Sequence, residues 1–104
     1  MRRLTLAIAL ILAAPLAAHP LAGGWSEVPK AALVVEVGPI ARFAVAHLPK
    51  PHGQLKTIVG AETQVVAGTN YRMLLVLSDG KRWRVQVWKK LDGTMQLSHF
   101  RRAD

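Results

Sequence analysis

The sequence predicts an α+β fold, in which one α-helix is wrapped by an antiparallel sheet of four to five strands. Two patterns carry this prediction. Apolar residues recur at three- and four-residue steps near residues 39–48, and at alternate positions through much of the chain after residue 53. Turn signals divide this second region into strands joined as hairpins. Packing the helix against the sheet buries both apolar faces.

The amino-terminal residues differ in composition from the rest. Two arginines precede the apolar run Leu4–Ala14, which is shorter than the roughly 20 residues of a membrane-spanning helix. This layout is typical of a secretory signal. We therefore expect residues 1–18 to be a signal peptide, cleaved after Ala18 or, less favourably, after Ala22. Residues 19–104 then form one domain that is exported, either periplasmic or secreted, with no membrane segment after signal removal.

An extended arm is expected over residues 19–29, because two prolines and two glycines leave no room for a regular element beyond a short edge strand. The helix should start near Pro39, since proline is favourable in a first helical turn. Residues 33–37 form either a preceding turn or a kinked extension, and Pro49 ends the helix. The predicted apolar face comprises Ile40, Phe43, Ala44 and Leu48, with Arg42 and Ala46 off that face.

Four strands follow the helix, at residues 55–66, 71–77, 83–87 and 95–100, with turns at 67–69, 78–80 and 91–93. Gly60 is a candidate bulge in the first of these strands. The second strand alternates from Tyr71 to Leu77, but Leu74 and Val76 make its other face apolar as well. Both faces of this strand are therefore candidates for burial.

Composition excludes several classes of function. The chain has 104 residues, a formal charge of +8 and no cysteine, so disulfides, cysteine-ligated metals and a cysteine nucleophile are ruled out. Its histidines are not paired at metal-ligand spacing, and its acidic residues are scattered singly. We therefore predict no metal site, no cofactor and no enzymatic activity.

The basic charge has two interpretations. Five cations lie on one predicted hairpin with Trp83 and Trp88 between them: Lys81, Arg82, Arg84, Lys89 and Lys90. Such interleaving suits polyanion binding, yet alternation places Trp83 on the apolar face. A solvated basic face is the simpler interpretation, and we expect no nucleic acid partner. An exported basic module that binds a polyanion or another partner stays open as an alternative.

Two hairpin tips are candidates for contact with a partner, because one of them is apolar where a solvated turn is usually polar. The first comprises Gln64, Val65, Val66, Ala67 and Gly68, and the second Leu91, Asp92 and Gly93. Counting strand directions places both tips at the same end of the sheet, within reach of the glycine arm. Exposed apolar groups of this kind indicate contact with a partner.

These segments together resemble the cystatins, most closely the disulfide-free plant-type branch. Gln64–Gly68 matches the family's QxVxG loop, and Ile40–Val45 resembles its helix signature. Leu21-Ala22-Gly23-Gly24 resembles its amino-terminal arm, and Val87-Trp88 with Leu97 and Phe100 its final hairpin. The leader and the double glycine fit a bacterial exported member, and a eukaryotic secretory route stays open as an alternative.

The resemblance implies a monomeric, reversible inhibitor of papain-like cysteine peptidases. In such an inhibitor, three segments form a wedge that enters the active-site cleft of the peptidase. In this chain the wedge would comprise Leu21, Ala22, Gly23 and Gly24 of the arm, Gln64 to Gly68 of the first tip, and Trp88, Leu91, Asp92 and Gly93 of the second hairpin. One departure concerns that hairpin, where the family often carries Pro-Trp and this chain has Lys90-Leu91-Asp92-Gly93. A family member that has lost inhibition is a further alternative.

Overall fold

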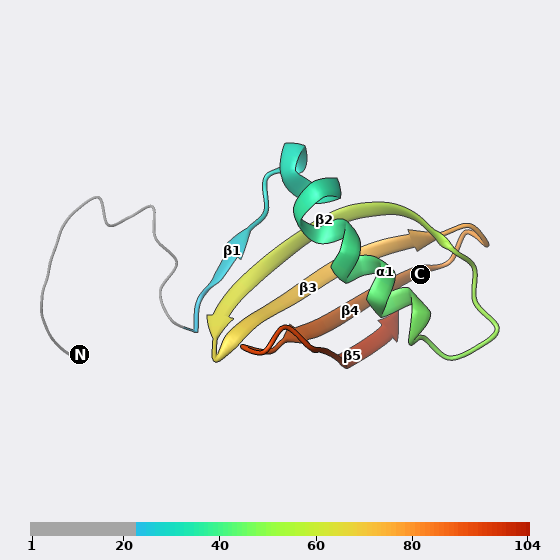
Figure 1. Cartoon of the computed structure of the whole chain (residues 1–104). Helices are drawn as coiled ribbons and strands as arrows, with labels where there is room; N and C mark the ends of the chain where they lie inside the picture. Colours follow the sequence, from blue (N-terminus) through green and yellow to red (C-terminus); the bar gives the residue numbers. More distant parts are fainter. Residues whose placement is uncertain (1–22) are drawn as a thin grey trace, which may run out of the picture.

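The computed structural model describes residues 23–104, and the predicted signal peptide, Leu21 and Ala22 lie outside this range. Its elements in chain order are β1 (Trp25–Glu27), η2 (Lys30–Ala32), η3 (Leu33–Val37), α1 (Gly38–Ala46), β2 (Leu55–Val66), β3 (Gly68–Leu77), β4 (Arg82–Lys89) and β5 (Met95–Arg102). The strands form one antiparallel sheet in the order β1-β2-β3-β4-β5. The helix runs across one face of this sheet (Figure 1). The predicted α+β architecture is confirmed, including the edge strand in the arm.

The helical segment changes type along its length. The 3₁₀ turn η2 leads into the π-helical turns of η3, and these continue directly into α1. Residues 33–37 are therefore the kinked extension, one of the two predicted possibilities. Pro39 lies in the first turn of α1 and has no N–H to donate to the carbonyl of Val35, so a regular α-helical ladder cannot run through this point.

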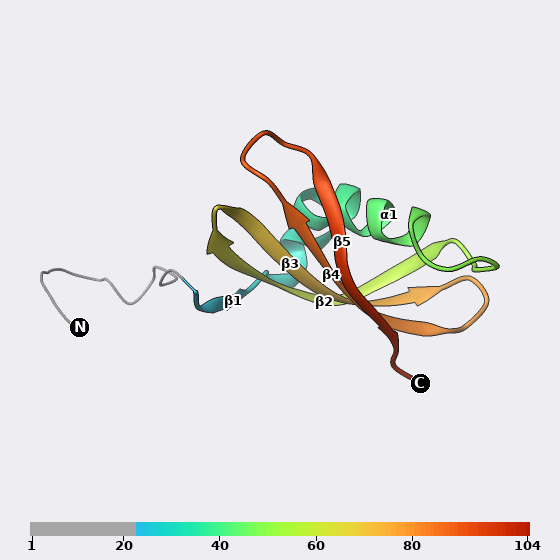
Figure 2. The same ribbon diagram turned by 90° about the horizontal axis from the view of Figure 1, so that it is seen from below.

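The core lies between the helix and the inner face of the sheet. The predicted helix face is confirmed for Ile40 and Ala44, which are buried, while Phe43 is half-buried and packs against the core. Leu48 is buried too, but it lies beyond the end of α1 at Ala46. From the sheet, the buried side chains are Ala61, Met73, Leu75, Leu77, Val85 and Val87. Trp83 also packs against this core, as alternation predicted. Figure 2 shows the helix on one side of the strands and no described element on the other.

The hairpins differ from the predicted boundaries in two details. The predicted bulge at Gly60 is confirmed, since the register shifts between Ile58 and Gly60, but β2 has a second register shift between Leu55 and Thr57 that was not predicted. Pairing between β2 and β3 continues to Val66 and Gly68, which reduces the predicted three-residue turn to Ala67. Backbone pairing thus extends further into this tip than side-chain alternation indicated.

Candidate functional site

The first tip is a tight hairpin in which residue 68 has to be glycine. Gly68 has a φ of 96°, a conformation that side chains other than glycine adopt only with strain. A Cβ atom on Gly68 would lie 2.2 Å from the carbonyl oxygen of Lys89 on the neighbouring strand. The hairpin can therefore lie this close to β4 only with glycine. Just before it, Val65 and Val66 are 48% and 39% exposed.

The two hairpins are bonded to each other at their tips. The indole Nε1 of Trp88 donates a hydrogen bond of 2.9 Å to the carbonyl oxygen of Ala67. The ladder between β3 and β4 reaches this point as well, since Thr69 pairs with Lys89. Lys90 adds its Nζ over the Trp88 ring, 5.2 Å from the centroid. Trp88 thus fixes the first tip relative to the second.

The second tip is organised by the Asp92 carboxylate. The backbone N–H of Thr94 and its hydroxyl donate to Asp92 Oδ1 at 2.9 and 2.7 Å. The bond from the Thr94 hydroxyl, then that from its N–H, together with nearby Lys90, hold the pKa of Asp92 below its ordinary value. Gly93, with a φ of 89°, completes the turn by donating to the carbonyl of Lys90 at 2.9 Å. The turn presents Leu91, which is 82% exposed.

The arm is attached to the first hairpin through Gln64. The Nε2 of Gln64 donates to the carbonyl oxygen of Gly23 at 2.8 Å, and Gly23 N–H donates to the carbonyl of Val65 at 3.3 Å. On its other side, Gln64 Oε1 accepts a bond of 2.8 Å from Asn70 Nδ2. Sequence reasoning missed Asn70, although counting outward from the turn places it opposite Gln64. From here Gly24 leads into β1.

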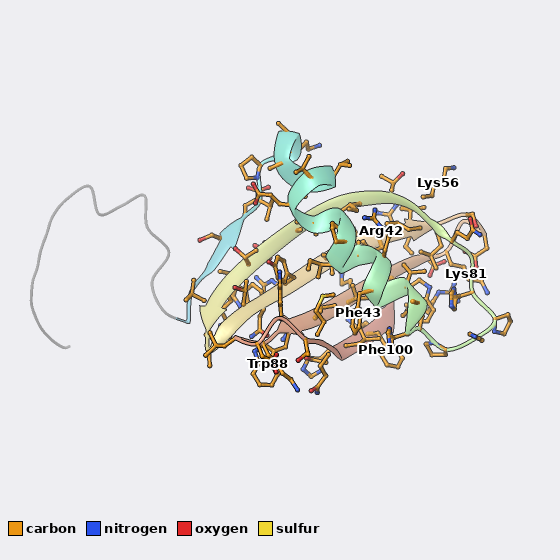
Figure 3. All side chains as sticks on the ribbon, in the orientation of Figure 1. Arg42, Phe43, Lys56, Lys81, Trp88 and Phe100 are labelled. Carbon is orange, nitrogen blue, oxygen red and sulfur yellow. The ribbon has the colours of Figure 1, made fainter. Side chains whose placement is uncertain are left out.

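These contacts bring three segments to one end of the sheet. We call this end the three-segment edge: Gly23 and Gly24, residues 64–68, and Trp88 with residues 91–93. The arm and both tips lie at the same end in Figure 1, and Trp88 is labelled there in Figure 3. The predicted convergence of the two tips is therefore confirmed. The Leu21 and Ala22 positions of the predicted wedge lie outside the described residues.

Residues 23–104 contain neither a candidate metal cluster nor a membrane-spanning helix. No group of three or more His, Cys, Asp or Glu side chains in this range is placed to hold a metal ion. No helix in it has the length and apolar character needed to cross a membrane.

No protein-family model matches the chain, but individual proteins do. Over 77 residues it is 39% identical to Cysteine proteinase inhibitor 5 of Arabidopsis thaliana, covering 65% of this chain and 61% of that protein. It is 38% identical over 88 residues to Cystatin-1 of Zea mays, covering 78% and 65% respectively. The chain is a relative of the cystatins and has the cystatin fold. A third cystatin relative, Cysteine proteinase inhibitor 1 of Actinidia chinensis var. chinensis, is 37% identical over 75 residues, covering 66% of this chain and 64% of the relative.

The cystatin fold is supported separately by a solved structure. The salivary cystatin from the soft tick Ornithodoros moubata superposes with a TM-score of 0.64 over 81% of this chain and 100% of the tick chain, at 18% identity. The chain spans 61 to 65% of the length of its curated cystatin relatives. Those relatives are named as cystatins or inhibitors, which agrees with the prediction that this chain is not an enzyme.

Proposed function

We propose that the protein is a reversible, tight-binding inhibitor of papain-like cysteine peptidases, with the three-segment edge as a wedge in the active-site cleft. The observation that carries this proposal is the convergence of the arm and both tips, linked by Gln64 and Trp88. The names of the curated relatives support the same class of partner. The protein would act as a monomer after export, with residues 1–18 removed.

The exposed side chains of the edge suit a cleft that binds peptides. Val65, Val66 and Leu91 present apolar surface at the ends of two hairpins, and apolar groups gain free energy when a partner covers them. In the second hairpin, Leu91 supplies the apolar group where the family often has Pro-Trp. Contact through two tips and an arm is compatible with a standard interface of about 1,600 Å².

Rigidity of the edge favours affinity. The backbone around Ala67 is held by the β2–β3 ladder and by the Trp88 indole, while Asp92 holds the second turn. Little conformational entropy is then lost on binding. The carbonyl of Ala67 already accepts the Trp88 bond, so the first tip enters the cleft as an ordered hairpin rather than as a flexible substrate.

Titration of papain with the purified protein tests this proposal. We expect complete inhibition by the parent, and an affinity at least about a hundredfold lower for the double variant Val65→Asp/Val66→Asp, because carboxylates would be buried at the centre of the interface. Val34→Asp/Val35→Asp is the matched control. These valines are 76% and 80% exposed on η3, so this variant should inhibit like the parent. Absence of inhibition by the parent at micromolar concentration, or equal losses in both variants, would refute the wedge.

A further inference from the structure

A groove on the outer face of the sheet, opposite the helix, is separate from the three-segment edge. Cross-strand neighbours place Gly60, Leu74, Arg84 and Arg101 in one row across β2 to β5. Glu62, Arg72, Gln86 and His99 form the next row. Both rows line a single pocket together with Glu27 and Val59. We call this the outer-face groove.

The floor of the outer-face groove is apolar. Leu74 lies in β3, the central strand of the sheet, and is half-buried although it faces away from the helix. Next to it, Gly60 leaves open space, since a Cβ there would meet nothing within 4 Å. A strand with apolar residues on both faces is typical of a sheet that is covered on both faces. Within residues 23–104 the helical segment covers one face only (Figure 2).

The charge at one side of the groove is positive and unbalanced. Arg84 and Arg101 are exposed and lie directly opposite each other on β4 and β5. Like charges in this arrangement destabilise a strand pair. Neither forms a salt bridge within the described part of the chain, where the two ion pairs are Arg72–Glu62 and Arg102–Asp104. Arg82 adds a third exposed guanidinium two residues before Arg84.

We propose that the outer-face groove binds an acidic polypeptide segment in extended conformation, with an apolar side chain on Leu74 and carboxylates on Arg84 and Arg101. Arginine binds carboxylates with paired hydrogen bonds. Residues two apart on a strand lie about 7 Å apart on one face, which is also the spacing of alternate side chains in an extended peptide. Arg84 and the directly opposite Arg101 can therefore bind one carboxylate, and Arg82 can meet the next one along the peptide.

The lining favours a polypeptide over other anions. A sulfated polysaccharide has no apolar side chain to place on Leu74, so it would use only the cationic side of the groove. Single-stranded nucleic acid is usually held by stacking on exposed aromatic rings. Phe100 is 47% exposed, but it is the cross-strand partner of the buried Val85, so its ring lies on the helix side of the sheet and pairs with Trp83 at a centroid distance of 6.2 Å. A peptide with both acidic and apolar side chains matches both features of the groove.

This proposal does not rest on peptidase inhibition. Leu74 is six residues from Gly68 along β3, which corresponds to about 20 Å of extended strand. A groove variant should therefore leave papain inhibition unchanged, and failure of one proposal can be distinguished from failure of the other.

The test is fluorescence anisotropy with the purified protein at 0.15 M salt (about physiological) and a labelled octapeptide of alternating Glu and Leu. We expect saturable binding that weakens at least tenfold in Arg84→Glu/Arg101→Glu and several-fold in Leu74→Ser. The single variant Arg84→Glu is included because it should stay folded: the introduced carboxylate can pair with Arg101 on the neighbouring strand. It should lower affinity to an intermediate degree.

The matched control is Arg42→Glu/Lys56→Glu, which makes the same change in net charge at exposed positions on α1 and β2 (Figure 3). It should retain binding within about threefold, since screening at this salt weakens distant charges. Equal losses in the control, equal binding of a Glu–Ser octapeptide, or tighter binding of heparin or oligo(dT) than of the Glu–Leu peptide would overturn the proposal.

Discussion

Gly68 shows how one residue sets the geometry of the candidate site. Its positive φ closes the first hairpin, and its missing side chain lets that hairpin lie against the backbone of Lys89. The first property agrees with the sequence, because a glycine at a turn is favoured where φ is positive. The second was not predicted, because it depends on β4, a strand distant in sequence.

Comparing Gly68→Ala with Gly80→Ala separates these two properties. Gly80 has a φ of 84°, but a Cβ there would have nothing within 4 Å. Gly80→Ala should therefore cost about 1 kcal/mol of unfolding free energy from backbone strain alone. Gly68→Ala should cost about 3 kcal/mol and weaken papain inhibition. Urea unfolding measures both, and equal costs would contradict a requirement for close approach to Lys89.

Asp92 makes the second tip sensitive to acid. Because bonds from Thr94 lower its pKa in the folded protein, Asp92 contributes stability that is present above the ordinary carboxyl pKa of about 3.9. That contribution is lost as the pH falls through the lowered value. Asp92→Ala should therefore lower the urea midpoint at pH 7 but change it less at about pH 2.5. A difference that stays constant with pH would show that the carboxylate does not hold the turn.

At the scale of elements, local patterns predicted most of the fold. Alternation identified the strands, and Pro39 located the start of α1. Local patterns did not predict the π-helical turns of η3, which depend on packing of Leu33 and Val37 into the core. They also missed the Gln64–Asn70 bond and the attachment of Gly23, since these require the register between β2 and β3 and the path of the arm.

Gln64→Glu tests the attachment of the arm to the first hairpin. Glutamate keeps the acceptor for Asn70 but loses the donor to Gly23 and places a negative charge beside its carbonyl. We expect a stability close to that of the parent and about tenfold weaker papain inhibition, which corresponds to about 1.4 kcal/mol. Faster hydrogen exchange at the Gly23 amide would accompany the loss. Weaker inhibition with unchanged exchange at Gly23 would instead locate the effect in the cleft.

At the scale of the whole molecule, the fold places the two proposed binding surfaces on different parts of the sheet. The three-segment edge lies at one end of the sheet (Figures 1 and 2). The residues of the outer-face groove lie in the middle of strands β2 to β5, on the face opposite the helix. The core between helix and inner sheet face belongs to neither surface. Substitutions at one surface should therefore leave the other surface and the core intact.

Processing at the amino terminus gives a test at this scale. We expect the exported protein to begin at His19, which mass spectrometry of the secreted or periplasmic form can measure. A version that begins at Gly23 keeps every contact described here, because the core and both tips lie within residues 23–104. It should therefore unfold at the same urea concentration as the longer form. Its papain inhibition should nevertheless be at least about tenfold weaker, because Leu21 and Ala22 would no longer fill the substrate pockets. If both forms inhibit equally, the arm before Gly23 has no part in the wedge, and the two hairpin tips alone account for affinity.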